Sequence, residues 1–308
     1  MDTAGESPWD SWEGQALRWP AHRGMIVALG IRMLMRYLAL AVMTAAPVCA
    51  DTVYSSLPAP LPVNAPSIGY EANSLNELGY LVALSSGPAV LVSATVAMSD
   101  WAPASDWTAH IGETLGGSTL TAAGYDIGLT LKLYNVGAGD TVGAAIGSYT
   151  VDAFIPWRPD ASAGCGTGFL GSDGVCHSGL LVAVPFALPY VSVPGEFIYS
   201  LAFNTQHYGY APTGVAGPYN SLNFAVTLAD PSAGSNPDGR QEYSSVSLAT
   251  ALTSDGPASY VGEAEFDSTP EPACVALAGI GLLGLCLISR RARGKLNPHG
   301  IPPPGPAR

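Results

Sequence analysis

The most regular feature of the chain is a two-residue alternation of apolar and polar side chains. Apolar residues recur at every second position in six runs, at residues 90–98, 127–133, 149–155, 180–188, 197–203 and 222–228. A period of two places one set of side chains on one face of a strand, so each run predicts a strand with one buried face. Glycine-rich or proline-containing stretches at residues 137–140 and 193–195 mark turns between the runs.

The segments between these runs carry no helical repeat, so parallel strands joined by helices are not expected. We therefore predict an all-β protein, an antiparallel β-sandwich with jelly-roll-like connections, over residues 51–253. It should contain at least seven strands between Val53 and Leu252 and no helix longer than two turns. Residues 57–66 are proline-rich and should run extended along an edge. Residues 243–252 should form either a last strand or a short helix.

A long apolar segment near the C-terminus breaks with this alternation. Residues 273–289 contain no charge, and as a helix they would cover roughly 25 Å, the short end of a bilayer span. Arg290, Arg291 and Arg293 follow at once, and such arginines hold their end of a span in the cytoplasm. We predict a single transmembrane helix with the body outside. The alternatives are a buried core helix, which rarely ends in a basic cluster, and an ordinary tail anchor.

An export signal is predicted near the other end of the chain. Arg36 precedes a short apolar run, and Val48, Cys49 and Ala50 provide small residues for cleavage after Ala50. Residues 33–50 are therefore interpreted as a signal peptide. Lipidation of Cys49 is the weaker interpretation, because Val48 is large for the position before a lipidated cysteine.

Three further segments flank these elements, and residues 1–24 of the first show no apolar periodicity. Residues 1–32 form an upstream extension, either because the gene start lies at Met33 or Met35 or because the leader is long. Residues 254–269 are polar and acidic, and we interpret them as a spacer between the domain and the membrane. Residues 294–308 are proline-rich and are predicted to be disordered.

Composition and charge narrow the classes of partner. Charged residues make up 12% of the 308 residues, against 36 glycines and 26 prolines, which is typical of a turn-rich exported β protein. From Asp51 to Pro272, twenty acidic residues face three basic ones, a net charge of −17. Because such a surface repels nucleic acid and anionic lipid, we expect no nucleic-acid partner.

The C-terminal segment resembles a known sorting signal. Pro270, Glu271 and Pro272, the short apolar span and the cluster of Arg290, Arg291 and Arg293 are together similar to the PEP-CTERM signal of exported bacterial proteins. The resemblance implies that an exosortase, a membrane-embedded cysteine protease-like transpeptidase, reads the tripeptide within residues 270–293, removes the tail and passes the protein towards the cell surface. The chain departs from the pattern by continuing to Arg308.

The body carries a second resemblance. Four stretches look similar to an uncharacterised group of exported β proteins with the same tail: MSDW at 98–101, LKLYNVG at 131–137, IPWRP at 155–159, and the segment from Phe203 to Tyr219 that contains FNT, YGY and GPY. The resemblance implies a shared fold and export, and it implies no activity.

Two cysteines lie in the glycine-rich stretch CGTGFLGSDGVC. Export favours oxidation, so we predict a disulfide between Cys165 and Cys176, which would stabilise the fold by roughly 2–3 kcal/mol in the chain-entropy model. The alternative is a metal site that includes His177, but no further cysteine or histidine lies at ligand spacing. We predict no metal or cofactor.

Five aromatic residues at predicted strand ends and loops are candidate glycan contacts: Trp101, Trp107, Trp157, Tyr208 and Tyr210. If they are exposed, their rings can stack on sugars. The alternative is packing in the core and at corners, which aromatic residues favour.

Catalytic and calcium motifs are weak. The turn aspartates between residues 100 and 173 include no spaced D-x-D-x-D-G loop, so solvated turns are preferred over a calcium site. The chain has no G-x-S-x-G, H-E-x-x-H or phosphate loop, and we predict no catalytic residues. A glycosidase would need two carboxylates that meet only in three dimensions.

These observations favour an exported, non-catalytic protein of the cell surface or extracellular matrix, associated with extracellular polysaccharide. Its expected partners are an exosortase-type protease, the membrane through the C-terminal helix, and polysaccharide. The alternatives are a carbohydrate-binding module and, less favoured, a glycan-active hydrolase.

Overall fold

The computed structural model describes residues 50–246 and 251–269. These residues form an all-β body whose named strands pair antiparallel, and the longest helices among them have four residues. Each of the six alternating runs lies in a strand, except that the last run extends one residue, Leu228, beyond its strand. The predicted all-β class, the number of strands and the absence of long helices are therefore confirmed for this part of the chain.

The first of the two large sheets, sheet A, has seven strands around β4 (Ala89–Asp100). One side of β4 pairs with β11 (Leu180–Val193). The other side pairs first with β17 (Ala264–Ser268) and then with β13 (Leu222–Thr227). β1 (Asp51–Ser55) extends the sheet beyond β17, and β2 (Ser67–Gly69) and β16 (Val261–Gly262) pair with β13.

The second large sheet, sheet B, has six strands in a single path. Their order is β15 (Thr253–Pro257), β14 (Gln241–Ser245), β3 (Glu77–Ala83), β12 (Glu196–Phe203), β7 (Gly124–Val136) and β8 (Val142–Pro156). β3 is buried at every position from Glu77 to Val82.

Aromatic side chains from both sheets fill the shared core. Phe197 and Tyr199 of β12 lie with ring centroids 5.2 and 5.3 Å from Phe266 of β17, and Tyr80 of β3 lies 5.9 Å from Phe224 of β13. All five are fully buried, and burial of a large apolar side chain stabilises a fold by about 1.5–3 kcal/mol. The core therefore joins β12 and β3 of sheet B to β17 and β13 of sheet A.

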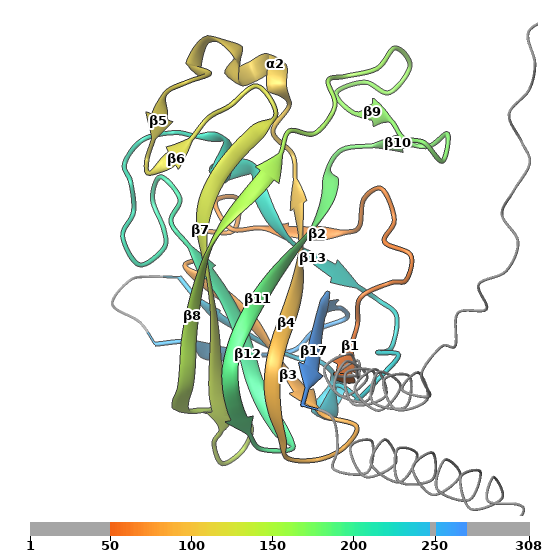
Figure 1. Cartoon of the computed structure of the whole chain (residues 1–308), viewed down its shortest axis with the longest axis vertical. Coiled ribbons are helices and arrows are strands. Elements are labelled where there is room, and N and C mark those ends of the chain that lie inside the picture. The colour runs from red at the N-terminus through yellow and green to blue at the C-terminus, as the bar shows by residue number, and fades with distance from the viewer. Residues whose placement is uncertain (1–49, 247–250, 270–308) are drawn as a thin grey trace, which may run out of the picture. The chain divides into compact units, whose positions relative to one another are not determined.

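The two ends of the strand layers differ (Figure 1). At one end, short turns join β3 to β4, β7 to β8 and β11 to β12. The other end carries α2 (Ala104–Trp107), η1 (Thr108–His110), and the short hairpins β5–β6 (Thr114–Leu115, Ser118–Thr119) and β9–β10 (Phe169–Leu170, Cys176–His177). η2 (Pro218–Ser221) precedes β13, and η3 (Pro237–Gly239) precedes β14.

The predicted acidic spacer at residues 254–269 is wrong. β15 and β17 lie in this stretch, and β17 is an inner strand between β1 and β4. Phe266 enters the core, while the carboxylates of Glu265 and Asp267 accept hydrogen bonds from Ser55 Oγ and Ser93 Oγ, both at 2.9 Å. Its acids Glu263, Glu265 and Asp267 are separated only by Ala264 and Phe266, which is why the composition of the segment resembles a linker. The folded body therefore extends to at least Ser268, beyond the predicted limit of 253. In the stretch 243–252, β14 confirms the strand alternative for residues 243–245.

Residues 57–66 form a strap that crosses sheet A instead of following one edge. Val63 O accepts a hydrogen bond from Leu181 N at 2.9 Å, Asn64 Oδ1 accepts one from Ser99 Oγ at 2.8 Å, and Pro66 O accepts one from Val226 N at 2.8 Å. The strap thereby contacts β11, β4 and β13 in turn. Its prolines have no N–H to leave unpaired, which suits a chain that crosses strands.

The predicted upstream extension (1–32), signal peptide (33–50, except Ala50), sorting segment (270–293) and tail (294–308) lie outside the described residues. Pro270, Glu271, Pro272, Arg290, Arg291 and Arg293 are among them. In the part of the chain that is described, no helix has the length and apolar character needed to cross a membrane.

Candidate functional site

Polar side chains of neighbouring strands gather on the outer face of sheet B, away from the shared core. On β7 the outward positions alternate with the buried leucines and include Thr130, Lys132 and Tyr134. The register places Lys132 opposite Ser200 of β12, and Thr130 opposite Thr150 of β8. The two threonine hydroxyls lie 2.9 Å apart, so the strand register alone assembles this polar group.

Glu77, the first residue of β3, is the charged centre of this group. Its side chain is buried, and Lys132 Nζ lies 2.6 Å from Oε2. Tyr134 donates its hydroxyl proton to Oε1 at 2.9 Å, and Ser200 also donates to Oε1. Removing a carboxylate from water is costly unless it is paired and hydrogen-bonded, and these three donors offset that cost.

The same contacts fix the protonation of Tyr134. Burial, and then the negative charge of Glu77, raise the pKa of Tyr134 well above that of a free tyrosine. The hydroxyl therefore remains protonated at neutral pH and acts as a donor to Glu77. Glu77, Lys132, Tyr134 and Ser200 form one polar network, which we call the Glu77 network.

A cavity of about 390 Å³ opens beside the Glu77 network. Its lining residues are Asn76, Glu77, Lys132, Tyr134, Val142, Gly143, Tyr210, Ala251 and Leu252. Tyr210 is 48% exposed, and its hydroxyl oxygen lies 3.5 Å from Thr130 Oγ1. The cavity thus combines an ion pair, formed by a buried carboxylate and a partly exposed ammonium group, with a partly exposed aromatic ring. Glu77 is the one carboxylate among these lining residues.

The loop that carries Tyr210 is held by its own hydrogen bonds. Asn204 Oδ1 accepts from Ala211 N at 2.7 Å, and Thr205 Oγ1 accepts from Tyr208 N at 2.8 Å. Gly209 has a φ of +108°, and a Cβ at this position would lie 2.3 Å from the carbonyl oxygen of Phe203. The FNT and YGY motifs of the sequence therefore build the loop that places Tyr210 over sheet B.

The other predicted glycan contacts lie apart from this cavity. Trp101 is 43% exposed, and its Nε1 donates to Ser99 Oγ at 3.1 Å. Trp107 is half-buried against the core, and Tyr208 is half-buried in its loop. Trp157 is 8% exposed, so it offers no face to a sugar, and the packing alternative holds for this residue. The structure brings Tyr210 alone of these five to the lining of the cavity.

The MSDW and IPWRP motifs pack against each other at the end of the sheets that carries α2 and the two short hairpins. Arg158 Nε donates to Trp101 O at 2.7 Å, and Tyr125 donates its hydroxyl proton to Asp100 Oδ1 at 2.9 Å. Trp157 packs against Tyr125 in a tilted arrangement with ring centroids 5.1 Å apart, and its Nε1 donates to Thr121 O at 2.9 Å. Burial raises the pKa of Asp100 to about 7. These contacts join β4 to the end of β8, so they explain both motifs by packing.

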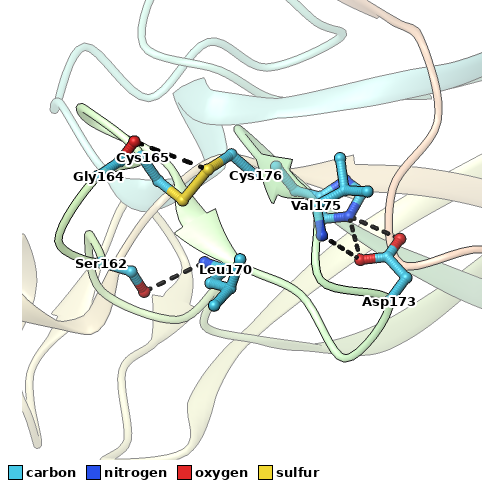
Figure 2. The surroundings of a disulfide bond; sticks show 8 residues. Ser162, Gly164, Cys165, Leu170, Asp173, Val175 and Cys176 are labelled. Carbon is cyan, nitrogen blue, oxygen red and sulfur yellow. Dashed lines mark hydrogen bonds and ion pairs between the residues drawn. A yellow bond between two sulfur atoms is a disulfide. The ribbon is translucent and has the colours of Figure 1, made fainter.

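Cys165 and Cys176 form a disulfide, as predicted (Figure 2). His177 Nε2 lies 3.0 Å from both carboxylate oxygens of Asp173. Hydrogen bonds from Val175 N and then from His177 lower the pKa of Asp173. His177 is thus engaged within its own loop, and no three His, Cys, Asp or Glu residues of the described chain form a cluster that could hold a metal.

A second cavity, of about 530 Å³, lies at the end with the short turns. Its lining residues are Ala83, Leu84, Gly87, Asn135, Val136, Pro194, Gly195 and Glu196. This lining has one charged side chain and no aromatic ring. We therefore consider the cavity at the Glu77 network the stronger candidate site.

Comparison with protein-family models, with curated proteins and with solved structures found no match to this chain. The site therefore has to be interpreted from its own geometry.

Sequence reasoning missed Glu77 and Lys132. Glu77 begins a strand without alternation, so it was not assigned to either face of a sheet. Lys132 carried a usable signal, because it is one of three basic residues between Asp51 and Pro272 and lies at the centre of a strand's polar face. A rare cation at that position indicates a buried or functional partner of opposite charge.

Proposed function

We propose that the protein is an exported, non-catalytic component of the cell surface or extracellular matrix, sorted by an exosortase-type protease. The observation that carries this proposal is the position of the first and last strands that the structure describes. β1 starts at Asp51, directly after the predicted cleavage site, and β17 ends at Ser268, two residues before Pro270. Asp51 and Ser268 are paired across adjacent strands.

The described body lies between the two predicted processing points, so loss of both flanking segments would leave all of its named strands in place. The disulfide between Cys165 and Cys176 supports the same proposal, because disulfides persist in oxidising compartments outside the cytoplasm. We interpret the two sheets with their shared core as a jelly-roll-like β-sandwich, a scaffold that presents sites on its faces and loops.

The test is to replace Pro270, Glu271 and Pro272 together by alanine in a host that has an exosortase. The apolar span and the arginines remain, so we expect insertion to be unchanged and release or surface delivery to be blocked, with the unprocessed protein in the membrane fraction. Mass spectrometry of the mature protein would give both ends. If the variant is processed and delivered like the parent, the tripeptide is only a spacer and the sorting proposal fails.

We propose carbohydrate binding as a second function of the same body. It is favoured by one specific observation, the exposed ring of Tyr210 at a cavity lined by a charged pair. Ligand sites combine apolar or aromatic walls with a few fixed polar groups, and this cavity has both.

A further inference from the structure

We infer that the cavity at the Glu77 network binds a single neutral sugar ring, with Tyr210 as the stacking face and the Lys132–Glu77 pair as the hydroxyl-binding group. This inference rests on the proposed carbohydrate binding and names its site and its ligand class.

The hydrogen-bonding capacity of the pair suits two neighbouring hydroxyls. A carboxylate offers about four acceptor positions and an ammonium group three donors. Glu77 receives donors from Lys132, Tyr134 and Ser200, and one of the Lys132 donors is directed at Glu77. An acceptor position on Glu77 and donors on Lys132 remain for a ligand. One sugar hydroxyl can donate to the carboxylate while its neighbour accepts from the ammonium group.

The charge of the site favours a neutral sugar over an acidic one. Lys132 Nζ lies 2.6 Å from Glu77 Oε2, so the pair carries no net charge towards a ligand. The body around it carries three basic residues against twenty acidic ones. A uronate carboxylate would have to approach Glu77 within an acidic protein, which costs like-charge repulsion. Hydroxyls have no such penalty.

The position of Tyr210 supplies the apolar contact. A Cβ placed on Gly128 would lie 3.8 Å from the Tyr210 hydroxyl, and Thr130 Oγ1 lies 3.5 Å from it. The ring therefore extends over the outer face of β7, where Gly128 has no side chain to displace it. The negative face of an aromatic ring attracts the weakly positive C–H groups of a sugar.

The size of the cavity fits one ring. Its volume of about 390 Å³ lies near the lower end of the roughly 300–1,000 Å³ of small-molecule sites. Lys132 is 26% exposed and Tyr210 48% exposed, so the groups that would contact the sugar are reachable from solvent. Ser200 is buried behind them, whereas the Glu77 carboxylate is reached through the cavity that it lines.

The test uses the full-length protein in detergent and the methyl glycosides of glucose, galactose, mannose and N-acetylglucosamine, with methyl glucuronide as the acidic counterpart. Saturation-transfer NMR and calorimetric titration measure binding. We expect at least one neutral glycoside to bind more tightly than the glucuronide. Tyr210→Ala should weaken that binding about tenfold, the loss of a favourable ring contact of ordinary strength. Tyr210→Phe should retain most of it.

Two exposed aromatic residues provide matched controls. Trp101→Ala removes the exposed ring at the loop end, and Tyr190→Ala removes a ring that is 73% exposed on β11. Neither should change the affinity. The inference is overturned if no neutral glycoside binds, if the glucuronide binds more tightly, or if Trp101→Ala has the effect expected of Tyr210→Ala. Because this assay is independent of sorting, failure of the export proposal would leave its result unchanged.

Discussion

Each of the two sheets buries a carboxylate, but in opposite surroundings. On sheet B, Glu77 is surrounded by three side-chain donors beside an open cavity. Glu263 lies where sheet A passes from β16 to β17, and its backbone joins Ala97 of β4 to Ala225 of β13. It is 2% exposed, and its Oε2 has no hydrogen-bond partner.

The two carboxylates therefore differ in whether the surrounding side chains stabilise the charged form. Burial raises the pKa of Glu263 to about 7, so the protonated form is favoured over most of the acidic range. At Glu77, Lys132 and the hydroxyls of Tyr134 and Ser200 instead contact the carboxylate. A buried carboxylate that lies beside a cavity and accepts hydrogen bonds can bind a ligand. A buried carboxylate without donors affects the stability of the fold instead.

The largest effect should come from removing the cation of sheet B. Lys132→Met keeps much of the side-chain volume but leaves Glu77 buried without its ionic partner, and breaking a buried pair costs about 3–5 kcal/mol. Because Lys132 is 26% exposed, we expect the lower part of that range, measured by urea unfolding at pH 7.

The control for this variant is Asp230→Ala. Asp230 pairs with Arg240 at 2.8 Å, but its side chain is 91% exposed, and exposed pairs contribute little. If both variants lose the same small amount of stability, the Glu77 network is not a buried charge centre. The contrast between Glu77 and Glu263 then disappears.

The next effect is on the pH dependence of stability, through Glu263 and Asp100. Both have pKa values raised to about 7 by burial, against about 4 in the unfolded chain. Between pH 4 and 7 the folded state therefore binds more protons than the unfolded state. Stability should fall as pH rises through this window and level off above pH 7.

Glu263→Gln and Asp100→Asn should each remove a share of this slope. Both replacements are neutral at every pH, and Asn keeps the oxygen that accepts from Tyr125. We expect each variant to be more stable than the parent at pH 8, by on the order of 1–3 kcal/mol, with little gain at pH 4. The control Glu265→Gln should leave the slope in place. A parent whose stability rises from pH 5 to 8 would contradict the assignment.

The fold could be predicted from sequence wherever a strand has one buried and one solvent-exposed face. β7 shows this alternation, and its core positions were identified correctly. β12 is buried on both faces, but the residues predicted for its core face (Phe197, Tyr199, Leu201 and Phe203) do lie in the main core. β3 was missed because both of its faces are covered: Leu78, Tyr80 and Val82 enter the main core, while Leu81 packs with Ile198 on the outer face. A strand buried on both sides has no alternation to detect.

The candidate site was predictable only in part. Tyr210 was identified as an aromatic residue in a loop, but its position over β7 depends on hydrogen bonds of Asn204 and Thr205 that no spacing reveals. Glu77 and Lys132 are 55 residues apart in sequence, and they meet only because β3 and β7 both pair with β12. Local sequence carries no information on such long-range pairing.

The smallest effect concerns the strap at residues 57–66, which makes the outer face of sheet A differ from that of sheet B. Asn64→Ala removes the acceptor of the Ser99 hydroxyl, a contact of 2.8 Å at a fully buried serine. A lost hydrogen bond of this kind costs about 1 kcal/mol. Ser99 Oγ still accepts from Trp101 Nε1, so the loss should not be larger. Hydrogen exchange should report it locally, as faster exchange of the Leu181 amide, which donates to Val63 O.

Leu61→Ala is the control, because Leu61 lies in the same strap but is 43% exposed, and it should change neither stability nor that exchange rate. If Asn64→Ala leaves the Leu181 amide as protected as in the parent, the strap is held by its carbonyl contacts alone.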